Sequence, residues 1–376
     1  MSRFAAIALA LACLAALTAQ PAAAHRTVPS GFYGVDYDRE IAWAKPKLQS
    51  ATWGSMAKSG VESARVIFDW RTAQPVEGQP PSFTDTDRSV ALAAAHGVQP
   101  LPVVMLAPAW ARVLPKEEGS APSNVPAYTQ YLRALVARYG PAGSFWAGRP
   151  DLPRRPIRNW QVWNEPDVPY QWSPRDEWQK RYGELLRPSA AALRDADPGA
   201  KVVLAALTND SWVALDQLYE MGDIRGSFDA VALNAYTRVP SHLIEILRRG
   251  REVMNQNGAS KLPIFVTEFG ASASKDRITA PGNEHLQTTD KGLAHLVTRM
   301  YQLLIRHRIE LGVRRAYWYT WASSYDTSRA IFDFAGLMRY RGGKVTARPA
   351  AAAYKKSALA AEGCKKDAHA GCKKQH

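Results

Sequence analysis

Short apolar segments alternate with longer amphipathic segments along most of this chain. The short segments are rich in β-branched residues, which is typical of strands buried in a parallel sheet. They predict eight strands, at Gly31–Asp36, Glu62–Phe68, Gln99–Met105, Ile157–Asn164, Lys201–Ala206, Phe228–Asn234, Pro263–Glu268 and Arg315–Thr320. The segments between them have helical spacing and predict helices at Arg39–Lys58, Asp85–His96, Val125–Tyr139, Pro174–Asp195, Ser241–Asn257 and Glu284–His307, with a last helix at Arg348–Ala361.

A strand followed by a helix or a shorter connection, eight times over, predicts an α/β fold of the (β/α)8 TIM-barrel type. Gly60 and Gly97 lie just after predicted helices and just before strands, where a left-handed terminating residue is expected. The chain has 376 residues and 46% hydrophobic content, enough for one large core. We therefore expect a single catalytic domain over residues 25–361.

The N-terminus has the order of features found in export signals. Arg3 precedes the apolar run Phe4–Leu17, and the small residues of Pro21–Ala24 follow. This order predicts a signal peptide over residues 1–24 and a secreted, periplasmic or cell-surface protein. A membrane anchor, for which about 14 apolar residues are short, and a lipoprotein attached through Cys13 are the alternatives. No later segment is apolar enough to cross a bilayer, so the mature chain is not expected to span a membrane.

The formal net charge of +14 is concentrated at the C-terminus. Residues 339–376 contain ten Lys and Arg but only two Asp and Glu. No nucleic-acid-binding motif accompanies these charges, and aromatic residues do not interleave with them, so no nucleic-acid partner is predicted. Two interpretations of this basic tail stay open, namely contact with an anionic cell-surface polymer and simple solubility.

Residues 362–376 form a separate tail that carries two cysteines, Cys364 and Cys372. In an oxidising compartment these cysteines could close a small disulfide loop. Two free thiols, or a weak metal site with His369 and His376, are the alternatives.

Two carboxylates occupy equivalent places, each at the last position of a short apolar run. Glu165 lies in Trp160–Asp167 and Glu268 lies in Pro263–Gly270. The carboxyl ends of the strands are where barrel enzymes carry reactive groups, and the fourth and seventh strands face each other across the mouth. Two converging acids suggest a general acid and a nucleophile. A separation of about 5–5.5 Å would give a retaining glycosidase, and a wider gap would admit a water molecule and give inversion. We predict the shorter separation.

Motifs for other chemistries are absent from the sequence. It contains no His-Glu-x-x-His, no paired Cys-x-x-Cys, no glycine-rich phosphate loop and no Gly-x-Ser-x-Gly. The sequence therefore predicts neither a cofactor nor a catalytic metal.

The two acidic motifs resemble those of a known group of enzymes. Trp163–Pro166, followed by Thr267–Gly270, resembles the clan of retaining glycoside hydrolases built on TIM barrels (clan A), and more narrowly glycoside hydrolase family 39. Three later segments resemble the C-terminal part of the barrel in that group, where the last strand leads to a final helix. They are Ala316–Trp321, Phe334–Leu337 and Arg348–Ala350. The resemblance extends from Gly31 to Tyr354. It implies hydrolysis of xylosides, uronides or secreted polysaccharides, which is a range of substrates rather than one sugar.

The resemblance also implies roles for individual residues. Glu165 would be the acid/base and Glu268 the nucleophile. The supporting residues would be Arg65 beside the nucleophile, Asn164 on the sugar 2-hydroxyl, Tyr236 bonded to the nucleophile and Trp321 as the aromatic floor of the cleavage subsite. Asn234 departs from the pattern, because the clan more often carries histidine there, and asparagine can bond a hydroxyl but cannot carry charge.

Tryptophans gather near the predicted strand ends, at Trp70, Trp110, Trp163, Trp172, Trp318 and Trp321. Indole rings stack on sugar faces, so these side chains are either subsite platforms or ordinary core residues.

The leading hypothesis is an exported retaining glycoside hydrolase that cleaves O-glycosidic bonds in a polysaccharide or oligosaccharide by double displacement. One alternative is a catalytically inactive carbohydrate-binding barrel protein. Another is a transglycosylase that remodels cell-surface glycan with the same residues.

Overall fold

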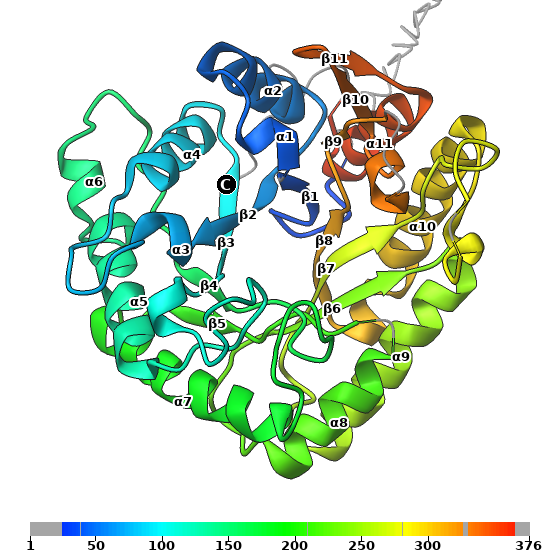
Figure 1. The fold of residues 1–376 in the computed structure, drawn as a ribbon. Coiled ribbons are helices and arrows are strands. Elements are labelled where there is room, and N and C mark those ends of the chain that lie inside the picture. The colour runs from blue at the N-terminus through cyan, green and yellow to red at the C-terminus, as the bar shows by residue number, and fades with distance from the viewer. Residues whose placement is uncertain (1–24, 38, 209, 280, 326–329, 365–376) are drawn as a thin grey trace, which may run out of the picture.

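A computed structural model describes residues 25–37, 39–208, 210–279, 281–325 and 330–364 (Figure 1). The predicted signal peptide and most of the basic tail, including Cys372, lie outside these described residues. Cys364 takes part in a disulfide bond.

Eight parallel strands form the centre of the molecule. They are β1 (Tyr33–Tyr37), β2 (Ser63–Asp69), β3 (Gln99–Met105), β4 (Asn159–Val162), β5 (Lys201–Val203), β6 (Val231–Tyr236), β7 (Ile264–Gly270) and β8 (Val313–Trp318). Their order in the sheet is β5-β4-β3-β2-β1-β8-β7-β6. Parallel bridges from Val203 to Ala230 and from Leu207 to Leu233 join β5 to the β6 side. The strands thus form a ring, and the predicted TIM barrel is confirmed.

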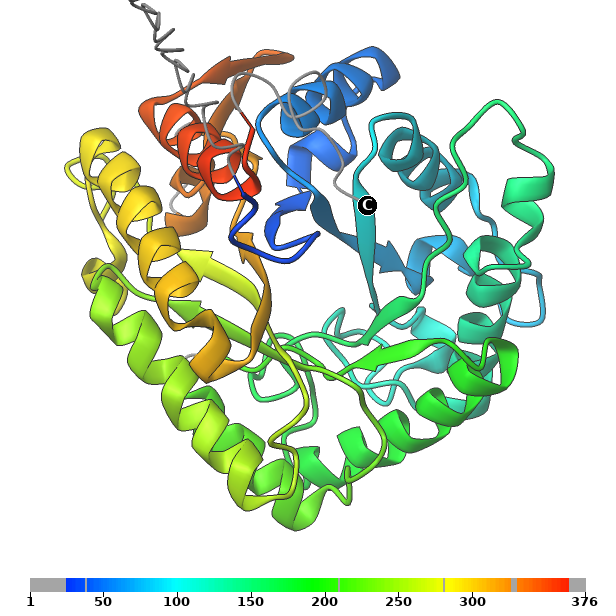
Figure 2. The ribbon, with the colours of Figure 1, turned by 180° about the vertical axis from the view of Figure 1, so that it is seen from behind.

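Helices surround the ring on its outer side, as the two opposite views show (Figures 1 and 2). They are α1 (Arg39–Ala42), α2 (Pro46–Lys58), α3 (Trp70–Ala73), α4 (Thr84–Ala95), α5 (Val125–Tyr139), α6 (Ser144–Ala147), α7 (Trp178–Ala196), α8 (Ser211–Met221), α9 (Pro240–Gln256), α10 (Asp290–Leu311) and α11 (Pro349–Glu362). Short 3-10 helices lie at Ala109–Ala111, Glu284–Leu286 and Ile331–Phe334. None of the helices in the described ranges is long and apolar enough to cross a membrane.

Two predicted helices differ from the observed ones for local reasons. The helix expected over Arg39–Lys58 is two helices, because Pro46 starts α2 at its first position and disfavours helical backbone in the residue before it. The helix expected from Glu284 begins at Asp290, where the Thr289 side chain accepts a hydrogen bond from the Gly292 amide as an N-cap.

A small second sheet follows the barrel and was not predicted. It consists of β9 (Ala322–Ser323), β10 (Met338–Arg341) and β11 (Lys344–Ala347). Gly342 and Gly343, with φ of 55° and 73°, make the tight antiparallel turn between β10 and β11. These strands have two to four residues each, too few for an alternating pattern to be visible in the sequence.

The barrel interior below the mouth is filled by a buried cluster. It contains Leu101, Val203, Ala206, Ala230, Ala232, Phe265 and Tyr317. Tyr317 reaches across to β1, where a Cβ on Gly34 would lie 2.4 Å from its ring, so only glycine fits at that position. The cluster closes the barrel from below and leaves the upper end open as the candidate site.

Candidate active site

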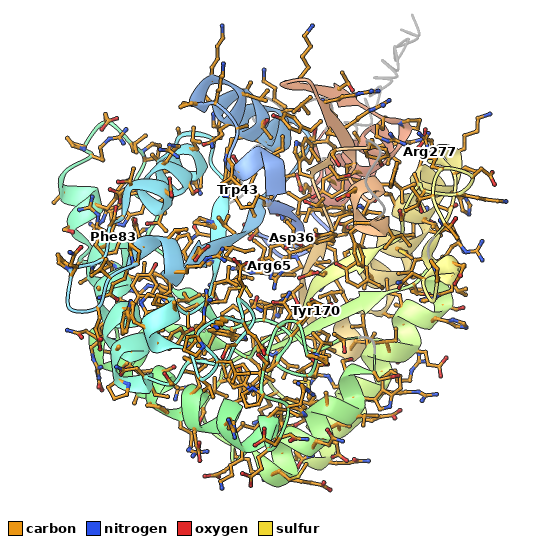
Figure 3. All side chains as sticks on the ribbon, in the orientation of Figure 1. Asp36, Trp43, Arg65, Phe83, Tyr170 and Arg277 are labelled. Atoms are coloured by element: carbon orange, nitrogen blue, oxygen red, sulfur yellow. The ribbon has the colours of Figure 1, made fainter. Side chains whose placement is uncertain are left out.

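A cavity of about 830 Å³ occupies the mouth of the barrel, at the carboxyl ends of the strands. Its lining comes from most of the barrel strands and their following loops, and includes Asp36, Arg65, Met105, Asn164, Glu165, Tyr170, Thr208, Tyr236, Glu268 and Tyr319. Asp36, Arg65 and Tyr170 are labelled near the centre of the ring in Figure 3. The strand-end positions predicted for chemistry therefore do converge.

Arg65, on β2, connects the polar side chains of this cavity. Its Nη1 donates to Asp36 Oδ1 at 2.8 Å and to Glu268 Oε1 at 2.6 Å. Its Nη2 donates to Asn164 Oδ1 at 2.6 Å. Burial alone would lower the pKa of Arg65, but the Asp36 and Glu268 charges raise it above its ordinary value, so the group stays cationic. Its Nε donates to Gln161 Oε1 at 3.0 Å. The planar fork therefore holds four acceptors at once, one more than the three N–H donors of a lysine could serve.

Glu268 is held at both carboxylate oxygens. Oε1 accepts from Arg65, and Oε2 accepts from the Tyr236 hydroxyl. Burial raises the pKa of Tyr236 well above its usual value, so its hydroxyl keeps its proton and remains a donor. Glu268 is 7% exposed. The arrangement presents a fixed, buried carboxylate next to a permanent positive charge.

Glu165 has a different environment from Glu268. Its Oε1 accepts from Asn234 Nδ2 at 2.7 Å, and its Oε2 lies 3.5 Å from the Tyr170 hydroxyl. Burial raises the pKa of Glu165 to about 8, and the nearby Glu268 charge adds to this shift, while the Asn234 bond opposes it. Glu165 is therefore protonated at neutral pH, as a general acid must be.

The backbone around Glu165 is unusual in conformation. Trp163 and Glu165 have φ of 69° and 45°, in the left-handed region that residues other than glycine seldom adopt. The amide of Trp163 donates to Val104 and that of Glu165 donates to Ala206, at 3.0 and 2.9 Å. Neighbouring strands thus hold a conformation that costs of order 1–3 kcal/mol per residue and that is found mostly at functional sites.

The register of β7 is irregular where it carries the site. Its pairing with β6 shifts between Leu233 and Asn234, and its pairing with β8 shifts between Val266 and Phe269. Consecutive strand residues normally point to opposite faces, but such irregularities re-aim side chains. Glu268 lines the cavity, and its neighbour Thr267 donates through Oγ1 to Asn234 Oδ1 at 2.8 Å, behind Glu165.

Most of the residues predicted for the site meet in this one place. Glu165, Glu268, Arg65, Asn164 and Tyr236 all line the cavity. Asn234 is fully buried behind Glu165 and bonds to the carboxyl group, not to the cavity surface. Within the described residues, no group of three His, Cys, Asp or Glu side chains could hold a metal ion.

Trp321 is a correction to the predicted set. It is 1% exposed, does not line the cavity, and packs against Tyr354 of α11 with ring centroids 6.5 Å apart. The chain has left β8 at this point and is about to start β9, so the indole faces the outer layer. Tyr319 lines the cavity instead, in a cluster with Tyr236 and Phe332.

The other tryptophans near the strand ends do not line the cavity either. Trp70, Trp163, Trp172 and Trp318 are at most 1% exposed and pack in the core. The aromatic residues of the cavity are Tyr170, Tyr236, Tyr319 and Phe332. Of these, sequence reasoning missed Tyr170, Tyr319 and Phe332, although Tyr170 follows the acid by only five residues.

This chain is similar to known proteins in structure but not in sequence. No family model matches the sequence, and no curated protein matches it in sequence. In structure, it is similar to a family 39 glycoside hydrolase from Bacteroides cellulosilyticus WH2, with a TM-score of 0.66 and 17% identity over 89% of this chain. This chain spans 64% of the length of that structure.

Two further solved structures give the same picture. A family 39 β-xylosidase from Caulobacter crescentus has a TM-score of 0.62 and 19% identity, covering 88% of this chain and 72% of its own. A glucosidase from Croceicoccus marinus has a TM-score of 0.64 and 14% identity, covering 92% and 70%. The chain therefore has the (β/α)8 barrel fold of the family 39 glycoside hydrolases and resembles them in structure.

Proposed function

We propose that this protein is a retaining glycoside hydrolase that cleaves O-glycosidic bonds in an oligosaccharide or polysaccharide. The observation that carries the proposal is the contrast between two buried carboxyl groups in one cavity. Glu165 is held protonated by burial, whereas Glu268 is paired with the Arg65 guanidinium. Such a pair supplies an acid and a nucleophile at the same pH.

In the first step, a carboxylate oxygen of Glu268 attacks the anomeric carbon of the sugar. The bond from that carbon to the glycosidic oxygen breaks, and Glu165 gives its proton to the departing oxygen. In the second step, Glu165 takes a proton from water, which attacks the anomeric carbon and releases Glu268. Asn164, whose Oδ1 accepts from Arg65, would bond the sugar 2-hydroxyl. Two displacements at one carbon retain its configuration.

The alternatives make different use of the same residues. A carbohydrate-binding barrel without activity has no need for two buried carboxyl groups in such different surroundings, so the site favours an enzyme. A transglycosylase would use the same two steps with a sugar in place of water. The similar structures include enzymes described as a β-xylosidase and a glucosidase. We propose β-xylosides and β-glucosides as the first substrates to try.

Covalent trapping tests the proposal directly. A panel of 2-deoxy-2-fluoro glycosyl fluorides should add one sugar to the peptide that contains Glu268, detected by mass spectrometry. Glu268→Gln should lose both labelling and turnover, whereas Glu184→Gln, at an exposed position on α7, should keep both. Proton NMR of the first product formed should show the anomer of the substrate. The opposite anomer would contradict the retaining mechanism.

The cellular location belongs to the same proposal. We propose that residues 1–24 are a signal peptide and that the mature protein is secreted, periplasmic or held at the cell surface. The basic tail would then meet anionic surface polymer. N-terminal sequencing of protein expressed with its full N-terminus should begin at His25. A start at Met1 or Ser2 would contradict export by this route.

A further inference from the structure

Tyr170 is an exposed aromatic residue beside the acid. It is 70% exposed, yet it lines the cavity, and its hydroxyl lies 3.5 Å from Glu165 Oε2. Figure 3 shows it near the centre of the barrel mouth. Among the described residues its ring has no aromatic stacking partner. A large apolar face left open to solvent in a cavity is the kind of surface on which a sugar ring stacks.

The orientation of Glu165 shows which side of the acid receives the leaving group. Oε1 is occupied by the Asn234 amide, whose own carbonyl is fixed by Thr267. Oε2 instead accepts from the Tyr170 hydroxyl at 3.5 Å, on the cavity side of the carboxyl group. Oε2 is therefore the oxygen from which a proton can pass to a glycosidic oxygen in the cavity, so the departing group lies on the Tyr170 side of Glu165.

The loop that carries Tyr170 is held in place from both sides. The Ser173 amide donates to the Gly119 carbonyl at 3.2 Å, and the Trp163 indole donates to the Gln171 carbonyl at 3.0 Å. A Cβ on Gly119 would lie 2.1 Å from the Tyr170 carbonyl oxygen, so the glycine permits this close approach. The backbone that carries the ring is therefore held in place before any ligand binds, which reduces the entropy lost on binding.

We propose that Tyr170 is the stacking platform of a subsite for the leaving-group sugar, and for the acceptor when the reaction runs in reverse. Gln171 and Thr208 line the cavity on the same side and offer polar groups to sugar hydroxyls. The ligand class is thus a pyranose ring on the departing side of the scissile bond. This inference rests on the proposed function, and it makes the substrate a glycan chain and not a glycoside of a small alcohol.

The test compares substrates that differ only in whether a ring departs. The pairs are xylobiose with β-xylosyl fluoride, and cellobiose with β-glucosyl fluoride. Fluoride has no ring to stack, so its release does not use this subsite. Tyr170→Ala should lower kcat/KM for the disaccharide about tenfold, as expected for losing one stacking contact, and change that for the fluoride less than about twofold. Tyr170→Phe, which keeps the ring, should retain most of the disaccharide activity.

Trp43→Ala is the matched control. Trp43 is 82% exposed but does not line the cavity, so its loss should leave both substrates unaffected. Equal losses on disaccharide and fluoride, or no loss with Tyr170→Ala, would overturn the subsite while leaving the proposed function intact. A wild-type protein that cleaves neither disaccharide and is labelled by no fluoro-sugar of the panel would overturn both.

Discussion

Asn234 and Glu165 are joined by a hydrogen bond of 2.7 Å between Nδ2 and Oε1, made where neither side chain is more than 7% exposed. The bond favours the ionised carboxylate and therefore lowers a pKa that burial raises. The acid is thus adjusted by two opposing influences, and each can be changed separately.

The pH dependence of activity follows from this balance. With Glu165 titrating at about 8, kcat/KM should be flat near neutral pH and fall as pH rises through about 8. Asn234→Ala removes the donor that lowers the pKa, so the basic limb should move to higher pH while the maximum rate falls. A pH–rate profile from pH 5 to 10 measures both effects.

Thr267 should act in the same direction through Asn234. Thr267→Val removes the donor that fixes the amide, so its basic limb should shift upward by less than that of Asn234→Ala. Thr267→Ser keeps a hydroxyl and should behave like the wild type. A basic limb that moves to lower pH in either Asn234→Ala or Thr267→Val would show that the amide does not support the ionised form.

Arg65→Lys should reduce activity strongly even though it conserves the positive charge. A lysine cannot reach Asp36, Glu268, Asn164 and Gln161 together, so Glu268, the proposed nucleophile, and Asn164 both lose their support. We expect kcat/KM to fall by about 10²–10³-fold, in the range seen when a preorganised polar contact is removed. Arg88→Lys, on the surface of α4, is the control. Activity within tenfold of the wild type would mean that charge alone suffices.

Another buried carboxyl group, that of Glu362, lies far from the cavity, at the end of α11. Burial raises the pKa of Glu362 to about 9, and the nearby Glu62 charge adds to the shift, so Glu362 is protonated at neutral pH. A carboxyl whose pKa is higher in the folded state stabilises the fold fully below its unfolded pKa of 4.5, and this stability is lost as pH rises through about 9.

The stability of Glu362→Gln should therefore fall less than that of the wild type as pH rises from 4.5 to about 9. We expect its Tm at pH 9 to exceed that of the wild type by about 2–5 °C, corresponding to one or two kcal/mol in a protein of this size. Thermal unfolding at pH 5, 7 and 9 measures this, and Glu252→Gln, exposed on α9, provides the comparison. A Tm difference that does not grow with pH would contradict the assignment.

Gly34→Ala tests the packing below the site. The added methyl group would lie 2.4 Å from the Tyr317 ring, which fills the barrel interior and cannot move freely. Overpacking of this kind costs about 1–3 kcal/mol. Gly148→Ala, where the nearest atom is 3.6 Å from the new carbon, should be nearly neutral. Denaturant unfolding of both variants gives the comparison.

The long regular elements could be read from the sequence because each has a strong pattern of its own. The predicted bounds of β3 and α5 coincide with the observed ones. Helix α8 was not predicted, since its eleven residues fall in a gap between two short strands. The sheet of β9 to β11 was missed because its pairing is decided by tertiary contacts and not by local alternation.

The site was predictable as far as strand ends could be located. Glu165 and Glu268 follow from their positions, since barrel geometry brings strand ends together. Arg65 lies in the middle of β2, and only the resemblance to the clan pointed to it. Trp321 was wrong as a lining residue because a single aromatic motif does not reveal where the chain turns away from the barrel. The support given by Thr267 was not visible either, since it depends on a register shift that no residue type announces.

Two consecutive residues of β7, where its register is irregular, contact the surroundings of both Glu165 and Glu268. Glu268 lies on this strand, and its neighbour Thr267 hydrogen-bonds to Asn234, which in turn donates to Glu165. A substitution that shifts this strand would therefore change the surroundings of both carboxyl groups at once.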